Sequence, residues 1–101
     1  MSNYPIEPGR VVVSRAGRDK GIAFVVLEKL DSFCLVANGT SRSVLRPKRK
    51  NNLHLVPQPD KIPPEGQQVP SDKRATDAYL RKELSRLGYN RKAAFDNKEE
   101  G

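Results

Sequence analysis

Between residues 9 and 57 the sequence carries five short stretches rich in β-branched and other apolar residues, separated by turn-forming residues. These stretches are residues 10–14, 22–27, 33–37, 43–45 and 54–56. No helix-like periodicity lies between them, so the pattern predicts an antiparallel meander. A meander of this length must curl on itself to bury a core and remove its edges, which predicts a small five-stranded barrel.

The barrel interior is expected to take large apolar side chains from alternating strand positions. The candidates are Val11, Val13, Phe24, Val26, Leu35, Val44 and Leu55. The stretch 22–27 is apolar throughout, so the choice of which of its side chains face inward stays open.

Two of the predicted turns depend on particular residue types. Residues 16–21 read Ala-Gly-Arg-Asp-Lys-Gly, and the glycines predict a turn that needs their backbone freedom. Asn38-Gly39 is a strong signal for a tight turn, and it predicts a hairpin between the third and fourth strands.

Outside the barrel the composition divides the chain further. Residues 1–8 are predicted to form an extended arm, and residues 58–70 a proline-rich linker. Residues 71–88 are predicted to form a helix, capped by Ser71 and ended by Gly88, with residues 89–101 as a flexible tail. The helix carries leucines at helical spacing, and the sequence leaves open whether they dock on the barrel or bind a partner.

The positive charge lies mainly in the predicted barrel. Residues 1–57 hold ten Lys and Arg against four Asp and Glu, a net charge of +6. Residues 58–101 hold nine against eight, a net charge of +1. Since a concentrated positive field favours a polyanionic partner, the barrel is predicted to contact nucleic acid or an acidic surface.

Within the barrel the cations gather in two predicted loops. The first loop contributes Arg15, Arg18 and Lys20, and the second contributes Arg46, Lys48, Arg49 and Lys50. Lysine and arginine side chains on loops reach phosphates, and arginine also stacks on unpaired bases. Asn51 and Asn52 follow and are candidates for hydrogen bonds to base edges or sugars. A basic run of this kind also occurs as a solvated loop or a targeting signal.

The stretch from Gly9 to Val26, GRVVVSRAGRDKGIAFVV, resembles a KOW motif, with Gly21 in the position of that motif's fixed glycine. The later stretch from Val44 to Pro57, VLRPKRKNNLHLVP, resembles the second half of the same family. The resemblance covers residues 9–57 and is to bacterial KOW-domain RNA-binding proteins. These are similar to an archaeal and eukaryotic large-subunit ribosomal protein with an SH3-like barrel.

The resemblance implies an SH3-like barrel that binds structured RNA, ribosomal RNA above all. Carried over by position, the implied RNA-binding residues are Arg15, Arg18, Lys20, Arg46, Lys48, Arg49, Lys50 and His54. Gly17 and Gly21 would shape the first loop rather than bind.

The sequence contains no recognisable catalytic set, such as a phosphate-binding glycine loop, a nucleophile with its base, or paired carboxylates. We therefore expect no enzyme activity and no cofactor. His54 is the only histidine and Cys34 the only cysteine, so neither a metal site nor a disulfide is expected. His54 is assigned a structural or RNA-stacking role, and Cys34 that of a small buried apolar residue. We also expect a cytoplasmic protein, since a single cysteine suits a reducing compartment and MSNYPIEPGR has no signal-peptide core. No membrane partner is expected, because the longest apolar run, residues 22–27, is too short to span a bilayer, and nothing in the sequence requires a dimer, so a monomer is expected.

Three functions remain open. The first is binding to structured RNA, with selectivity for shape. The second is a protein-interaction module in a transcription or translation complex, with ribosomal or transcription proteins as partners. The third is binding to DNA, which ranks lower because no helix offers an evident set of base-reading residues.

Overall fold

A computed structural model describes residues 4–62 and 76–90. Its strands are β1 (Arg10–Ser14), β2 (Ala23–Lys29), β3 (Phe33–Ala37), β4 (Lys48–Asn51) and β5 (Leu55–Lys61). Two short 3-10 turns, η1 (Gly17–Asp19) and η2 (Asn52–His54), and one helix, α1 (Asp77–Arg86), complete the described elements. The expected mainly β chain with a C-terminal helix is therefore confirmed.

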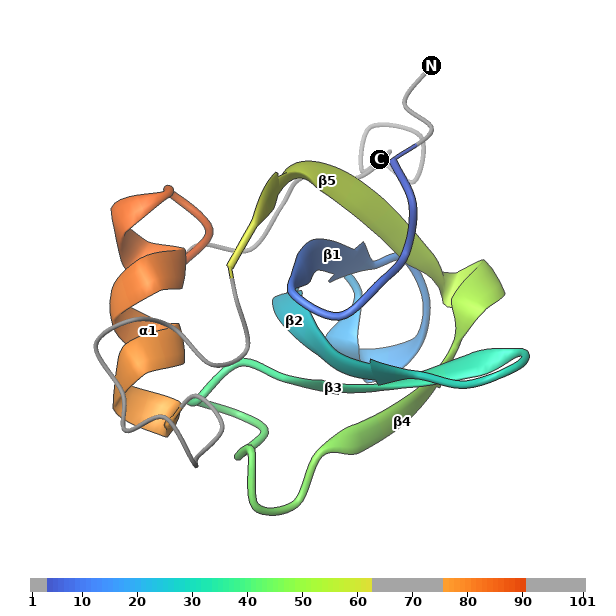
Figure 1. Ribbon diagram of the computed structural model, residues 1–101, viewed down its shortest axis with the longest axis horizontal. Helices are drawn as coiled ribbons and strands as arrows, with labels where there is room; N and C mark the ends of the chain where they lie inside the picture. Colours follow the sequence, from blue (N-terminus) through green and yellow to red (C-terminus); the bar gives the residue numbers. More distant parts are fainter. Residues whose placement is uncertain (1–3, 63–75, 91–101) are drawn as a thin grey trace.

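The strands form one antiparallel sheet in the order β4-β3-β2-β1-β5. The sheet curls so that β5 arches over β1 (Figure 1), and register shifts in the β1–β5 and β2–β3 ladders add to the bend. The sheet is not closed, because β4 and β5 lie at opposite ends of the strand order. Both edges carry residues that discourage pairing with another chain: lysines in β4, and Pro57 and Pro59 in β5.

The first three strands lie close to their predicted positions, but the predicted strand at residues 43–45 is wrong. These residues form a loop that is hydrogen-bonded to the first residue of α1. The Asp77 carboxylate accepts hydrogen bonds from Ser43 Oγ (2.7 Å) and from the Val44 amide (2.8 Å). The Val44 amide is thus bonded to a side chain rather than to a neighbouring strand. Asn38-Gly39 consequently opens a longer loop, and β4 begins only at Lys48.

The fourth strand is the basic segment that the sequence pattern assigned to a loop. A polar strand of this kind lacks the apolar alternation from which strands are predicted. It is part of the sheet because its backbone pairs with β3 in an antiparallel ladder. At the other edge, β5 continues to Lys61, beyond the expected barrel end at residue 57. Residues 63–70 of the predicted linker lie outside the described residues.

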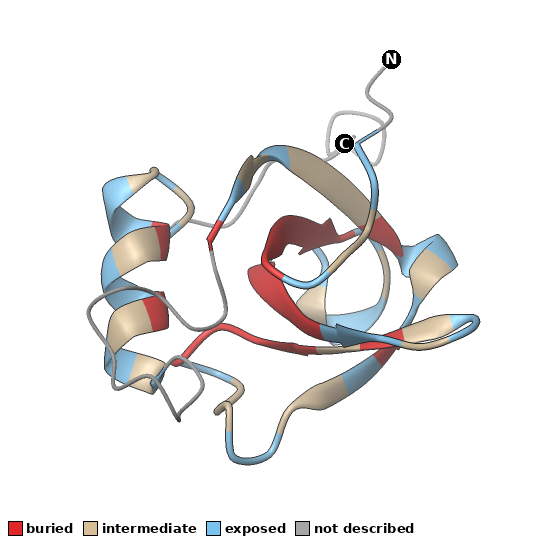
Figure 2. Cartoon of the chain, viewed as in Figure 1, coloured by how far each residue is buried: buried red, intermediate tan, exposed pale blue. Residues whose placement is uncertain are grey.

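Most residues of β1 and β2 are buried (Figure 2), and the buried apolar residues form two clusters, one on each face of the sheet. The inner cluster, on the concave face, comprises Val12, Phe24, Val26, Cys34, Val36 and Leu55. The outer cluster, on the face that α1 covers, comprises Val11, Val13, Ala23, Val25, Leu27, Ala37, Ile62, Leu80 and Leu84.

The predicted interior combined residues from these two faces and needs correction. Phe24, Val26 and Leu55 do lie in the inner cluster, whereas Val11 and Val13 lie in the outer cluster. Two further candidates, Leu35 and Val44, are only partly buried. The reason is that β1 and β2 are covered on both faces, so their sequences show no alternation that would separate the two sets.

Helix α1 begins after Thr76, whose side chain accepts a hydrogen bond from the Tyr79 amide at 3.1 Å. The predicted cap, Ser71, lies outside the described residues. Gly88 ends the helix as expected: it has a positive φ of 89°, and its amide donates to the Ser85 carbonyl.

The leucine stripe of α1 docks on its own sheet. Leu80 and Leu84 are 0% and 4% exposed and lie in the outer cluster. At the end of the helix, Tyr89 donates a hydrogen bond to Asp60 Oδ2 at 2.7 Å and so connects the helix to β5. Burial, followed by this hydrogen bond, raises the pKa of Tyr89, so the phenol remains a donor at neutral pH.

The loop after β3 approaches α1 so closely that it requires glycine. Gly39 has a φ of +80°, and a Cβ atom placed there would lie 2.3 Å from the Asp77 carbonyl oxygen. Its own carbonyl accepts a hydrogen bond from Arg81 Nη1 at 2.6 Å. Asn38 supports the loop, because its Oδ1 accepts from the Thr40 and Arg42 amides.

We predict that Gly39→Ala destabilises the protein more than Gly17→Ala does. Gly17 has a similar φ of +72°, but no atom lies within 4 Å of the position that a Cβ would take, so it bears only the left-handed backbone cost of about 1 to 2 kcal/mol. Gly39→Ala adds a clash with backbone, worth about 1 to 3 kcal/mol more. Urea denaturation of both variants measures the free energy of unfolding. Equal decreases in the two variants would contradict the close approach of Gly39 to the Asp77 backbone.

Candidate nucleic-acid interface

The first basic loop is a closed turn between β1 and β2. The Gly21 amide donates to the Ser14 carbonyl at 2.8 Å, and the Ile22 amide donates to the Asp19 carbonyl at 2.8 Å. Gly17 and Gly21 have positive φ values of 72° and 89°, which this turn requires. The loop presents its three cations to solvent; Arg15, Arg18 and Lys20 are all exposed.

The second basic segment is divided by the alternation of β4. Lys48 and Lys50 are opposite Val36 and Cys34, two residues of the inner cluster, so both lysines lie on the inner face. Arg49 is opposite Leu35 and lies on the outer face. The expectation of a single basic loop at residues 46–50 is therefore wrong, because a strand sends successive side chains to opposite faces.

The two basic segments meet at Asp19. Its Oδ2 atom lies 3.0 Å from Lys48 Nζ and 3.6 Å from Lys50 Nζ, and we call these three residues the Asp19 cluster. The side chain of Lys50 is 9% exposed and that of Lys48 is 34% exposed. A lysine as buried as Lys50 needs a counter-charge, and Asp19 supplies it.

The electrostatics of Asp19 follow from this position. Burial raises the pKa of the carboxyl group, but the positive charges of Lys48 and then Lys50 outweigh burial and leave the pKa below its usual value. The carboxylate is therefore charged at neutral pH, and it holds the η1 turn against β4.

On the outer face Arg49 lies over an aromatic ring. Its Cζ atom is 3.8 Å from the centroid of the Phe33 ring, within range of a cation–π interaction. Arg49 is exposed and Phe33 is half-buried. We call these two residues the stacked pair.

His54 lies beside the first loop, since its carbonyl oxygen accepts a hydrogen bond from the Arg15 amide at 2.9 Å. Its imidazole is on an exposed residue, which keeps the expected stacking role open. Arg46 is also exposed, in the loop before β4, where its amide bonds to the Ser43 carbonyl. The position of Arg46 therefore depends on the loop that is hydrogen-bonded to α1 and not on the Asp19 cluster.

The two asparagines proposed for base contacts have structural hydrogen bonds. Asn51 Oδ1 caps η2 by accepting from the Leu53 amide at 2.8 Å. Asn52 Oδ1 accepts from the Cys34 thiol at 2.9 Å. Cys34 is fully buried in the inner cluster, as expected, and burial raises the pKa of its thiol.

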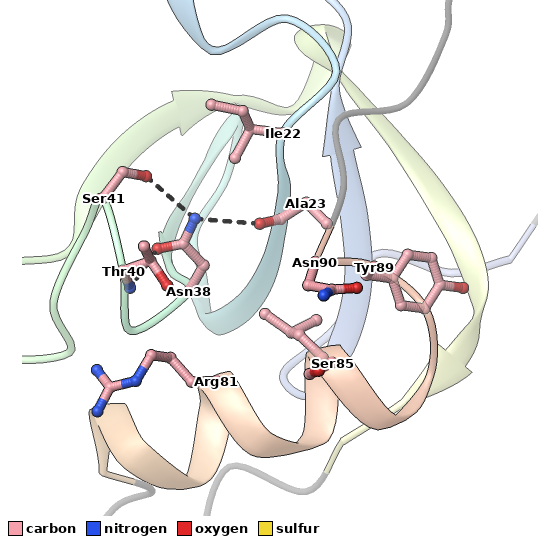
Figure 3. A pocket seen from close by; sticks show the side chains of 10 residues that line it. Ile22, Ala23, Asn38, Thr40, Ser41, Arg81, Ser85, Tyr89 and Asn90 are labelled. Atoms are coloured by element: carbon pink, nitrogen blue, oxygen red, sulfur yellow. Dashed lines mark hydrogen bonds between the residues drawn. The ribbon is translucent and has the colours of Figure 1, made fainter.

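A cleft that the sequence pattern did not indicate lies between α1 and the loop after β3 (Figure 3). Its volume is about 510 Å³. Its lining includes Ile22, Asn38, Ser41, Arg81, Leu84, Ser85 and Tyr89. The Asn38 amide group already donates its hydrogen bonds within the protein, because Nδ2 donates to the Ala23 carbonyl and to Ser41 Oγ. Asn38-Gly39 signals a turn, but nothing in the sequence indicates that α1 would pack beside it.

Over residues 4–62 and 76–90, the structure has no group of three or more His, Cys, Asp or Glu residues that could hold a metal ion. In the same part of the chain, no helix has both the length and the apolar character needed to cross a membrane. No protein family model matches the sequence.

We predict that the stabilising effect of Asp19 depends on pH. Because its folded-state pKa is depressed, its contribution is present above the unfolded pKa of about 4 and is lost as pH falls through the folded pKa. Asp19→Asn should cost about 1 to 3 kcal/mol at pH 7, since Lys50 loses its counter-charge.

The measurement is denaturant unfolding of wild type and Asp19→Asn between pH 7 and pH 2. The difference between the two proteins should shrink as the solution becomes acidic. Asp31→Asn, at an exposed turn residue, is the control and should match wild type throughout. A difference for Asp19→Asn that stays constant down to pH 2 would contradict the role assigned to the carboxylate.

Proposed function

We propose that this protein binds structured RNA, with ribosomal RNA as the first candidate, through the basic end of an SH3-like sheet of the KOW type. The observation that carries the proposal is the Asp19 cluster, which joins the first basic loop to β4. Through it, cations from two separate parts of the chain are held on one end of the sheet. The net charge of +6 over residues 1–57 agrees with a polyanionic ligand.

The form of the η1 turn supports binding to phosphates. Arg15, Arg18 and Lys20 are exposed on a turn whose backbone is closed by hydrogen bonds at both ends. Cations held on a closed turn lose less freedom on binding than cations on an open loop. Contacts to phosphate and to the 2′-hydroxyl would select RNA by shape rather than by sequence.

The proposal of an SH3-like fold rests on the curl and on the hairpin. The β1–β2 hairpin with its basic glycine turn is the feature that the KOW resemblance implies, and the five strands form one curled antiparallel sheet (Figure 1). The β4 and β5 edges are not joined by a ladder, so the proposal concerns the fold type and not a closed barrel.

A protein partner is the second candidate, and exposed leucines favour it. Leu45 and Leu53 are 86% and 79% exposed. The leucines of α1 are not available for this purpose because Leu80 and Leu84 are buried. Two isolated side chains make a small apolar surface, whereas the clustered cations form a larger feature, so RNA is the better-supported ligand.

The test is sedimentation with purified ribosomal particles and filter binding to ribosomal RNA, at about 50 and 200 mM salt. Wild type should bind, and its affinity should fall steeply with salt, as counterion release requires. Arg18→Glu/Lys20→Glu should weaken binding and reduce the salt slope by about 2, one for each lost phosphate contact.

The matched control is Lys82→Glu/Arg86→Glu on α1, which changes the net charge by the same amount away from the proposed interface. It should bind nearly as wild type does. Equal losses in the two double variants would show that net charge alone attracts RNA. A wild type that stays unbound at the lower salt concentration would refute RNA binding, and capture of protein partners that survives nuclease would favour the second candidate.

A further inference from the structure

We propose that the stacked pair, Phe33 and Arg49, is a platform on which an unpaired nucleobase of the RNA stacks. This inference rests on the proposed function and adds to it a specific chemical class of ligand. In this proposal the stacked pair recognises single-stranded segments, whereas the cations of the η1 turn contact phosphates.

The platform lies on a part of the outer face that α1 does not cover. In the β3–β4 ladder, Phe33 is opposite Asn51 and Leu35 is opposite Arg49, so these four side chains share that face. Helix α1 packs at the other end of β3, where Ala37 belongs to the outer cluster. The end of the face at Phe33 is therefore left half-buried, with Arg49 and Asn51 exposed.

The guanidinium of Arg49 is available to a ligand. Among residues 4–62 and 76–90 it makes no ion pair or hydrogen bond, and its contact with Phe33 at 3.8 Å is the one interaction it makes there. A guanidinium has two faces and five N–H donors, and the ring occupies one face only. The opposite face is free to stack on a base while the N–H groups reach a phosphate.

The ring fixes the direction of the guanidinium before any ligand arrives. A side chain that is already held in its binding position loses less rotamer freedom on association. Phe33 is a large aromatic residue on a face that receives no helix at this end, and its half-buried ring is covered by a cation rather than by the core. This arrangement is suited to a flat ligand, and every nucleobase has a flat π face.

Neighbouring groups supply polar contacts for a nucleotide placed there. Asn51 uses Oδ1 to cap η2, which leaves its Nδ2 group to donate to a base edge or a ribose hydroxyl. The exposed cations of the η1 turn, which the Asp19 cluster joins to the same edge strand, supply contacts to phosphates. An RNA strand that follows the β4 edge would therefore find cations on one side and the platform on the other.

A duplex cannot use this platform, because its bases are stacked on each other and paired. The stacked pair should therefore increase affinity for loops, bulges and single strands while leaving affinity for duplex unchanged. The cations of the η1 turn should contribute to both.

The test compares a single-stranded RNA 12-mer carrying 2-aminopurine with an RNA duplex of the same length. The variants are Arg49→Lys, which keeps the charge but loses the planar group, and Phe33→Leu, which keeps apolar volume but loses the ring. Each should weaken binding to the single strand by about tenfold and reduce the quenching of 2-aminopurine. Binding to the duplex should stay within about twofold of wild type, with an unchanged salt slope.

The control is Arg86→Lys, which makes the same chemical change at an exposed arginine of α1, away from the proposed interface, and should leave both affinities unchanged. Melting temperatures near wild type confirm that the variants fold. If Arg49→Lys and Arg86→Lys bind the single strand equally well, or if Arg49→Lys loses duplex and single strand alike, the platform is refuted while RNA binding stands. If wild type binds neither RNA, both proposals fail.

Discussion

The two-sided burial of β1 and β2 is the constraint on which the rest of the structure depends. Val11, Val12 and Val13 follow one another in β1, all of them nearly inaccessible to solvent, and they belong alternately to the outer and inner clusters. A single curled sheet covers only its concave face, so a second element must cover the other. Helix α1 supplies this cover through Leu80 and Leu84, and it captures the loop at residues 43–44 in doing so.

This constraint also determines where the charges lie. Because residues 11–14 and 23–27 of the central strands are buried, the two basic segments lie outside them, on the turn between β1 and β2 and on the edge strand β4. Lys48 and Lys50 point toward the inner face, where only a counter-charge makes their burial tolerable. Asp19 supplies that charge from the η1 turn, so the same contact that neutralises the lysines also brings the two basic segments together.

The sequence predicts the strongly patterned parts well. Strands β1 to β3, the glycine turn at residues 17–21 and the helix end at Gly88 depend on local residue types. The strand β4 could not be found in this way, because its apolar contribution is made by lysine stems and its ladder by backbone atoms. The loop at residues 43–45 has apolar, β-branched character but depends on Asp77, a residue distant in sequence, which no local pattern reveals.

The alternation of side chains along β4 changes the interpretation of the basic segment at residues 46–50. Net charge treats all ten cations of residues 1–57 alike, yet several of them have structural partners. Lys48 and Lys50 bind Asp19, and the buried Arg10 bonds to the Pro5 carbonyl and pairs with Glu7. The cations open to a ligand are therefore fewer, and their placement carries more of the selectivity than their number. Arg49 is the clearest case: one residue from two lysines with structural partners, it lies on the other face against an aromatic ring.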